Sequence, residues 1–179
     1  MSHTEFFPIV TESGDVIGRE SRAYCHSGSF VLHPVVHLHV LNSAGALYLQ
    51  KRAENKDVQP GKWDTSVGGH VDFGETVEQA LLREVREELG IVDFEPVFML
   101  RYKFTSDVEC ELVNSFYAVY DGEINPDPGE ISEGRFWTFS EITEAMGKGI
   151  FTPNFESEFT RLEKENLLPI NRQQVFGET

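Results

Sequence analysis

The sequence predicts an α+β domain, in which helices pack on a mixed β-sheet. The main observation is the order of the elements: strands come first, one strong helix follows, then more strands, then helices at the end. Hydrophobic residues make up 40% of the chain, enough to build a core. The length of 179 residues allows a single domain over 1–179.

The first strands are indicated by alternating patterns broken at turn residues. Residues 7–19 alternate around a Ser-Gly-Asp turn and predict an N-terminal β-hairpin. Residues 34–50 contain two strand-like runs, and the segment between them, 42–45, reads Asn-Ser-Ala-Gly, a favourable turn.

The strong helix is predicted over 76–89, a segment of good helix formers without Gly or Pro. Thr76 and Gln79 fit a capping box, and Gly90 stands where a helix stop is expected. Later elements follow from similar patterns: strands at 97–104, 110–120 and 134–139, a short helix capped by Ser140, and a last helix over about 153–167 that begins at Pro153.

The charge and the cysteines exclude several classes of protein. Fifteen basic and 30 acidic residues give a net charge of −15, which argues against nucleic-acid partners and against binding to anionic membranes. No apolar run approaches the roughly 18 residues of a membrane span. Two cysteines, Cys25 and Cys110, do not form a disulfide framework, so a cytoplasmic location is expected.

One face of the predicted helix carries an anomaly. Glu84, Glu87 and Glu88 lie in one sector beside its apolar stripe, where like charges repel and burial opposes ionisation. One interpretation is a solvated acidic edge that nearby arginines partly neutralise. The other is a site for Mg²⁺ or Mn²⁺, and the Gly-rich segment 68–74 before the helix favours it, because a backbone carbonyl there can add a ligand.

These residues resemble the signature of the Nudix hydrolases, the Nudix box, over residues 69–91. The matching positions are Gly69, Glu75 and the run Arg83-Glu84-Val85-Arg86-Glu87-Glu88-Leu89-Gly90-Ile91. The resemblance implies a mixed β-sheet sandwiched between α-helices, and hydrolysis of a nucleoside diphosphate linked to another group, X, or of a related diphosphate.

The same resemblance implies roles for the residues of the box. Glu84, Glu87 and Glu88 would be catalytic metal ligands, one of them a base for the attacking water, and the carbonyl of Gly68 would be a further ligand. Glu75 and Arg83 would join the loop to the helix. Gly69 and Gly90 would be structural.

Most of the chain, from about Ile9 to Ile142, also resembles one branch, the isopentenyl-diphosphate isomerases. By position, this branch implies a second divalent site, suited to Mn²⁺, Fe²⁺ or Zn²⁺, with the ligands His26, His33, His70, Glu109 and Glu111. It assigns the diphosphate to Arg52 and Lys56. Trp63 and Tyr102 are candidates for lining the pocket of X, with core packing as the alternative. His37 and His39 alternate onto one strand face and are interpreted as structural.

One departure separates the two chemistries. The isomerases carry a catalytic cysteine where this chain has Gly68, whereas the hydrolase signature is complete. The leading hypothesis is therefore a metal-dependent diphosphate hydrolase with a small-molecule substrate. The alternatives are an isomerase, and a catalytically silent module that binds a metabolite. The family resemblance also allows a homodimer.

Overall fold

The computed structural model describes residues 5–56 and 58–169. The expected domain over 1–179 therefore extends beyond the described residues at both ends. The chain opens with the predicted hairpin, formed by β1 (Phe6–Val10) and β2 (Val16–Ser21), and continues into a short helix, α1 (Arg22–Cys25), that the sequence patterns did not indicate.

The main sheet is mixed, as predicted. Its central strands, β3 (Leu32–Leu41) and β8 (Cys110–Val119), run parallel over ten paired positions, and the other pairings are antiparallel. The strand order is β5-β4-β3-β8-β7, with β6 paired to β3 and β9 paired to β4. The remaining strands are β4 (Leu47–Arg52), β5 (Trp63–Asp64), β6 (Val67–His70), β7 (Val97–Thr105) and β9 (Ile131–Trp137).

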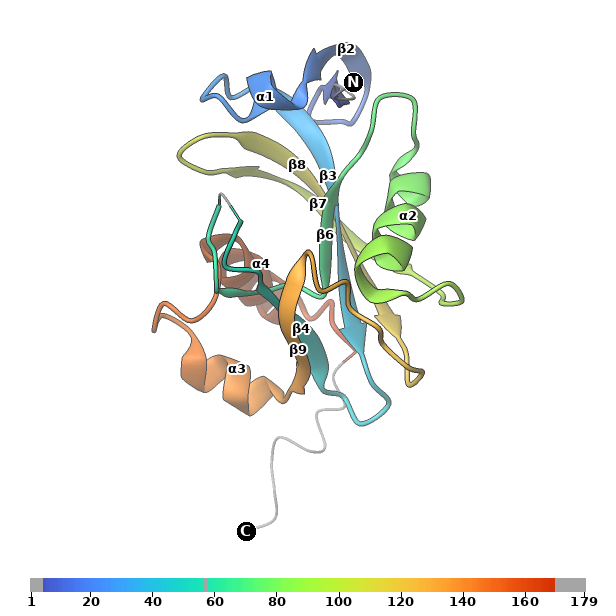
Figure 1. Ribbon diagram of the computed structural model, residues 1–179, viewed down its shortest axis with the longest axis vertical. Coiled ribbons are helices and arrows are strands. Elements are labelled where there is room, and N and C mark those ends of the chain that lie inside the picture. The colour runs from blue at the N-terminus through green and yellow to red at the C-terminus, as the bar shows by residue number, and fades with distance from the viewer. Residues whose placement is uncertain (1–4, 57, 170–179) are drawn as a thin grey trace.

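Helices cover both faces of this sheet, which confirms the α+β class (Figure 1). Alternate residues of β3, namely Val36, Leu38 and Val40, pack in a core with α2 (Val77–Leu89). The intervening residues face α4 (Pro153–Glu165), whose Phe155, Phe159 and Leu162 form a second core with α3 (Phe139–Ala145) and β4. Within the described residues, no helix is long and apolar enough to cross a membrane.

The sheet opens between β3 and β4. These strands pair only at Leu41 and Leu47, next to the turn that joins them, while β4 is paired along its length with β9. Figure 1 shows the two halves of the sheet spreading apart from this point. The divergence leaves room for a cleft above β6 and the face of α2.

The helix ends agree with the sequence signals except at two places. Thr76 and Gln79 form the predicted capping box of α2, and Gly90 closes the helix with a left-handed φ of 68°. The cap of α3 is Thr138 and not Ser140, because the Thr138 hydroxyl accepts a hydrogen bond from the Glu141 amide. The last helix ends at Glu165, where Asn166 adopts the left-handed conformation, two residues before the predicted end.

The identity of the α3 cap can be tested by two matched substitutions. Thr138→Ala removes the capping hydroxyl, so the free energy of unfolding should fall by about 1 kcal/mol. Ser140→Ala, two residues away and on the surface, should change it by less than about 0.5 kcal/mol. Urea denaturation measures both, and equal losses in the two variants would contradict the assignment of Thr138.

Candidate active site

A cleft of about 1210 Å³ opens between the two halves of the sheet. Residues from distant parts of the chain line it, and they include ten of the expected metal and substrate ligands: His26, Arg52, Lys56, Gly68, His70, Glu84, Glu87, Glu88, Glu109 and Glu111. The fold therefore gathers most of the expected site residues around one space.

Gly69 leaves room for the Glu84 side chain between α2 and β6. A Cβ atom at this position would overlap the carboxyl group of Glu84, so glycine lets this side chain lie against the strand in its present orientation. Arg83 fixes the approach of α2 to β6. Its guanidinium donates to both carboxylate oxygens of Glu75, at 2.8 and 2.9 Å, and to the carbonyl of His70 at 2.9 Å. The Gly-rich loop, the helix and β6 are thus held together.

The three glutamates of α2 differ in their exposure to solvent. Glu88 is buried, Glu84 is partly buried, and the Glu87 side chain is 61% exposed at the mouth of the cleft. Gln50 donates a 2.9 Å hydrogen bond to Glu88. Burial and then the neighbouring Glu84 raise the pKa of Glu88 to about 8, and burial also raises the pKa of Glu84.

This donor set fits a hard divalent cation. The carboxyl groups of Glu84 and Glu88 are crowded together in a desolvated place. Arg83 donates a hydrogen bond to Glu84, and the side-chain donor to Glu88 is the neutral amide of Gln50. A doubly charged ion bound to their oxygens would remove both the repulsion and the desolvation penalty. The carbonyl of Gly68 belongs to the same wall of the cleft.

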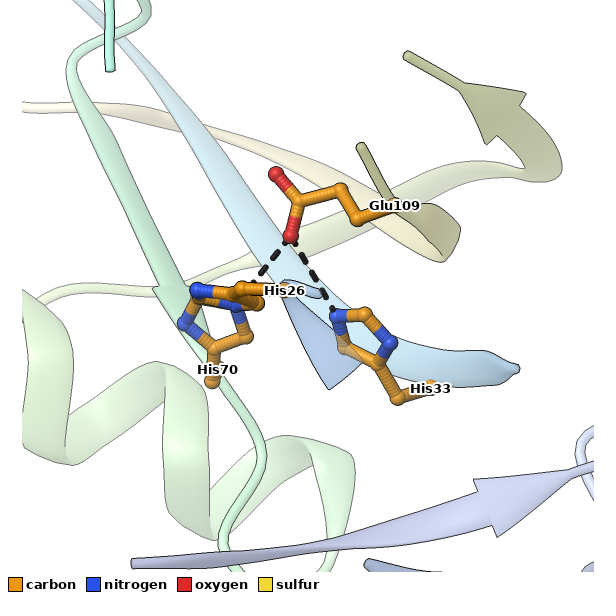
Figure 2. Close-up of side chains that lie close together, drawn as sticks. All are labelled: His26, His33, His70 and Glu109. Carbon is orange, nitrogen blue, oxygen red and sulfur yellow. Dashed lines mark hydrogen bonds and ion pairs between the residues drawn. The ribbon is translucent and has the colours of Figure 1, made fainter. Parts of the chain in front are cut away.

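A second cluster lies at the N-terminal end of β3, next to the N-terminal hairpin (Figure 2). One ligand atom from each of His26, His33, His70 and Glu109 lies within 4.8 Å of the others. The Glu109 carboxylate is 3.1 Å from Nε2 of His26 and 3.8 Å from Nε2 of His33. The Nε2 atoms of His26 and His70 are 3.1 Å apart.

The cluster has the chemistry of a transition-metal site. Nε2 of His33 and a Glu109 oxygen are buried without a hydrogen-bond partner among the described residues, which is unfavourable unless an ion binds them. Nδ1 of His33 donates to the Val31 carbonyl at 3.1 Å, so the Nε2 lone pair faces the cluster. Burial lowers the pKa of His26 to about 4 and lowers those of His33 and His70, which keeps the imidazoles neutral, as metal ligands require.

Glu111, expected as a fifth ligand, lies outside this group of ligand atoms. Its carboxylate is instead 3.5 Å from the amide nitrogen of Asn154 on α4. Burial, followed by the charge of Glu109, raises the pKa of Glu111 to about 7.

Arg52 and Lys56 line the opposite wall of the cleft from the α2 glutamates and are partly neutralised there. Nη1 of Arg52 is 3.5 Å from Asp64, its Nε donates to the Val58 carbonyl, and Lys56 pairs with Glu130. Both side chains are about one quarter exposed, so their donors can reach an incoming anion.

The structure does not bring Trp63 and Tyr102 into the lining of the cleft. Trp63 packs in the core, edge-on to Trp137 with the ring centroids 5.1 Å apart. Tyr102 is buried in a small cluster with Val35 and Val113, and its hydroxyl donates to Asn154 at 3.3 Å. Of the two interpretations offered for these aromatic residues, their positions agree with core packing.

Sequence reasoning missed three contributors to the site. Gln50 contacts Glu88 across 38 residues, which no local pattern reveals. His37 and Glu158 form a buried ion pair at 2.6 Å. A signal for Glu158 was present, because it stands on the apolar stripe of its helix between Phe155 and Leu162, where a charged residue requires a partner.

The mixed sheet covered by helices and the glutamate-bearing helix define a class of α+β domain, and comparison with known proteins identifies the family. A model of the NUDIX domain matches residues 31–155 of the chain. The chain belongs to the Nudix family.

The relatives within the family divide between two named activities. An isopentenyl-diphosphate Δ-isomerase of Paenarthrobacter aurescens is 29% identical and covers 95% of this chain and 97% of its own. An uncharacterized Nudix hydrolase of Nostoc is 34% identical over 83% of this chain and 89% of its own. The crystal structure of DR0079 from Deinococcus radiodurans superposes with a TM-score of 0.77 at 25% identity, covering 88% of this chain and 98% of that one.

The buried carboxyl group of Glu88 predicts a specific pH dependence of stability in metal-free protein. The pKa of Glu88 in the folded protein, about 8, lies above the ordinary value of 4.5. The protonated carboxyl group therefore contributes to the free energy of unfolding at low pH, and this contribution is lost as the pH rises toward 8. Between pH 5 and 8 in the presence of EDTA, the wild type should lose more stability than Glu88→Gln. Urea denaturation measures this difference, and parallel pH profiles would contradict the assignment.

Proposed function

We propose that the protein is a metal-dependent hydrolase that cleaves a diphosphate linkage in a small organic molecule. The observation that carries the proposal is the gathering of Glu84, Glu87, Glu88 and Gly68 on one wall of a cleft whose other wall presents Arg52 and Lys56. Carboxylates for a hard cation facing basic groups for an anion are the arrangement that a bound diphosphate requires.

Each wall has a distinct task. Mg²⁺ or Mn²⁺ held by the three glutamates and the Gly68 carbonyl would supply a Lewis acid that acidifies water and offsets charge on the leaving phosphate. Arg52 and Lys56 exchange part of their pairing with Asp64 and Glu130 for the outer phosphate oxygens. Gln50 fixes one oxygen of Glu88, and a carboxylate of this wall accepts the proton of the attacking water.

The second metal site belongs to the same proposal. The residues His26, His33, His70 and Glu109 would hold a transition-metal ion such as Mn²⁺, Fe²⁺ or Zn²⁺. This site adjoins the cleft, because three of the four residues also line it. There, the ion would join the end of α1, β3, β6 and the residue before β8 at one end of the cleft.

Isomerisation of isopentenyl diphosphate is the second candidate, and the histidine cluster favours it, since the isomerase branch carries ligands at these positions. Against it stands Gly68, which offers no side-chain acid where the isomerases use a thiol. A panel of nucleotide sugars, dinucleoside polyphosphates and isoprenyl diphosphates with Mg²⁺ and Mn²⁺, analysed by mass, separates the two. Cleavage of the P–O–P linkage into two phosphate-bearing products, with one water added, supports hydrolysis, whereas dimethylallyl diphosphate with its diphosphate intact would establish isomerisation.

Glu87→Gln tests the glutamate wall directly. The side chain is exposed at the cleft mouth, so the substitution should leave the melting temperature nearly unchanged while turnover of diphosphates falls by about 100-fold or more. Glu78→Gln is the matched control, because Glu78 is exposed on the same helix but does not line the cleft. Wild-type activity in Glu87→Gln would show that the site is wrongly assigned.

The histidine cluster is tested by its metal content. His26→Asn removes one ligand from a half-buried position, so the affinity for the transition metal should fall by at least about 100-fold. Elemental analysis after dialysis against a weak chelator measures the ion retained. The Glu87→Gln protein serves as control and should keep its ion. Equal metal content in the His26→Asn and wild-type proteins would exclude this centre.

A further inference from the structure

A buried ionic network lies behind the cleft, on the side of the sheet that α4 covers. The carboxylate of Glu158 is 2.6 Å from Nδ1 of His37 and 3.1 Å from Nε2 of His39, and both histidines project from the same face of β3. All three residues are buried. A buried carboxylate needs compensating positive charge, and these imidazoles provide it.

The network fixes the orientation of one ring. Nδ1 of His37 is directed at Glu158, so the opposite edge of the imidazole, with Nε2, is turned toward Gly68 on the paired strand. A Cβ atom at Gly68 would stand 3.7 Å from this Nε2 atom. The ring therefore lies within ordinary van der Waals contact of position 68, and the small exposed part of His37 lies in the wall of the cleft.

The charges in the network favour a stable, rigid arrangement. Burial alone would lower the pKa of His37, but the adjacent Glu158 carboxylate raises it to about 9. Burial would raise the pKa of Glu158, yet the two imidazoles hold it well below its ordinary value. Breaking the pair would leave an uncompensated buried charge, so the His37 ring stays in place when a ligand enters.

Other polar groups surround this part of the cleft. The Thr152 hydroxyl donates to Asp64 at 2.9 Å, and Asn154 contacts Glu111 at 3.5 Å. All four side chains line the cleft together with His37. This end of the cleft thus offers both hydrogen-bond donors and acceptors, and it lies beside Gly68, where the diphosphate is proposed to bind.

We propose that His37 is a specificity-determining residue, and that this polar end of the cleft binds a hydroxyl-bearing X group. The assignment of X to this end rests on the proposed diphosphate site. An apolar X would remove water from Asp64 and Glu111 without offering them a hydrogen bond in its place. A hydroxyl both donates and accepts, so it satisfies His37 and the acidic groups at once.

The experiment uses two matched probes, 2,3-dihydroxypropyl diphosphate and propyl diphosphate, which differ only in the two hydroxyls. Their kcat/KM values are measured on the full chain, and their Kd values on the Glu87→Gln chain, which should not consume them. The wild-type chain is expected to prefer the dihydroxy compound by at least about tenfold, the effect of one hydrogen bond. Equal values for the two probes would overturn the proposal.

Two substitutions separate a direct contact from a structural effect. In His37→Gln, the ratio of the kcat/KM values for the dihydroxy and propyl probes should fall close to one. His39→Gln should retain the wild-type ratio, because His39 contacts the same carboxylate but does not line the cleft. Equal loss in both variants would overturn the specificity role. Asn154→Ala, on the other side of the subsite, should also reduce the preference for the dihydroxy probe. This variant tests the subsite if His37→Gln does not fold.

The outcomes distinguish this inference from the proposed hydrolysis. If both probes bind with the expected preference but neither is cleaved, diphosphate hydrolysis is wrong and the subsite stands. If both are cleaved at equal rates, hydrolysis stands and the hydroxyl-binding subsite is wrong.

Discussion

The whole site depends on one close contact, between the backbone of β6 at Gly69 and the glutamate face of α2. Because position 69 has no side chain, Glu84 can lie directly against the strand, and the Glu75–Arg83 pair holds the two elements at this spacing. The contact places the Gly68 carbonyl and the carboxylates of Glu84 and Glu88 on one wall of the cleft. A larger residue at 69 would displace the Glu84 carboxylate from this position.

Two sets of buried carboxylates in this acidic chain are compensated in different ways. Glu158 has its counter-charge within the protein, supplied by His37 and His39, and therefore belongs to the permanent scaffold. Among the described residues, Glu88 has the neutral Gln50 amide as its side-chain donor and a backbone hydrogen bond from Gly68, and burial raises its pKa. The first arrangement has its charges paired within the protein, whereas the second gains stability from an added cation. This contrast is the physical basis for proposing a positioning role for Glu158 and a catalytic role for Glu88.

Strand β3 connects the core, the histidine cluster and the cleft. Its residues facing α2, such as Leu38, are apolar and fully buried, as expected for a central strand covered on both faces. The opposite face carries His33, His37 and His39, and each meets a different environment: the metal cluster, the cleft and the interior beneath α4. The histidines alternate along one face of β3, and their environments differ because different elements pack against successive parts of the strand.

The α+β class, the helix that carries the glutamates and the position of the Nudix box follow from the sequence alone, because they depend on neighbours within a few residues. Capping at Thr76 and the stop at Gly90 are of this kind. The meeting of distant groups is visible in the folded chain and not in local patterns. The fold pairs His37 with Glu158 across 121 residues, directs Glu111 toward Asn154 and places Trp63 in the core. Local periodicity gives the face on which a side chain lies, but the partner on that face is fixed by packing between elements far apart in the chain.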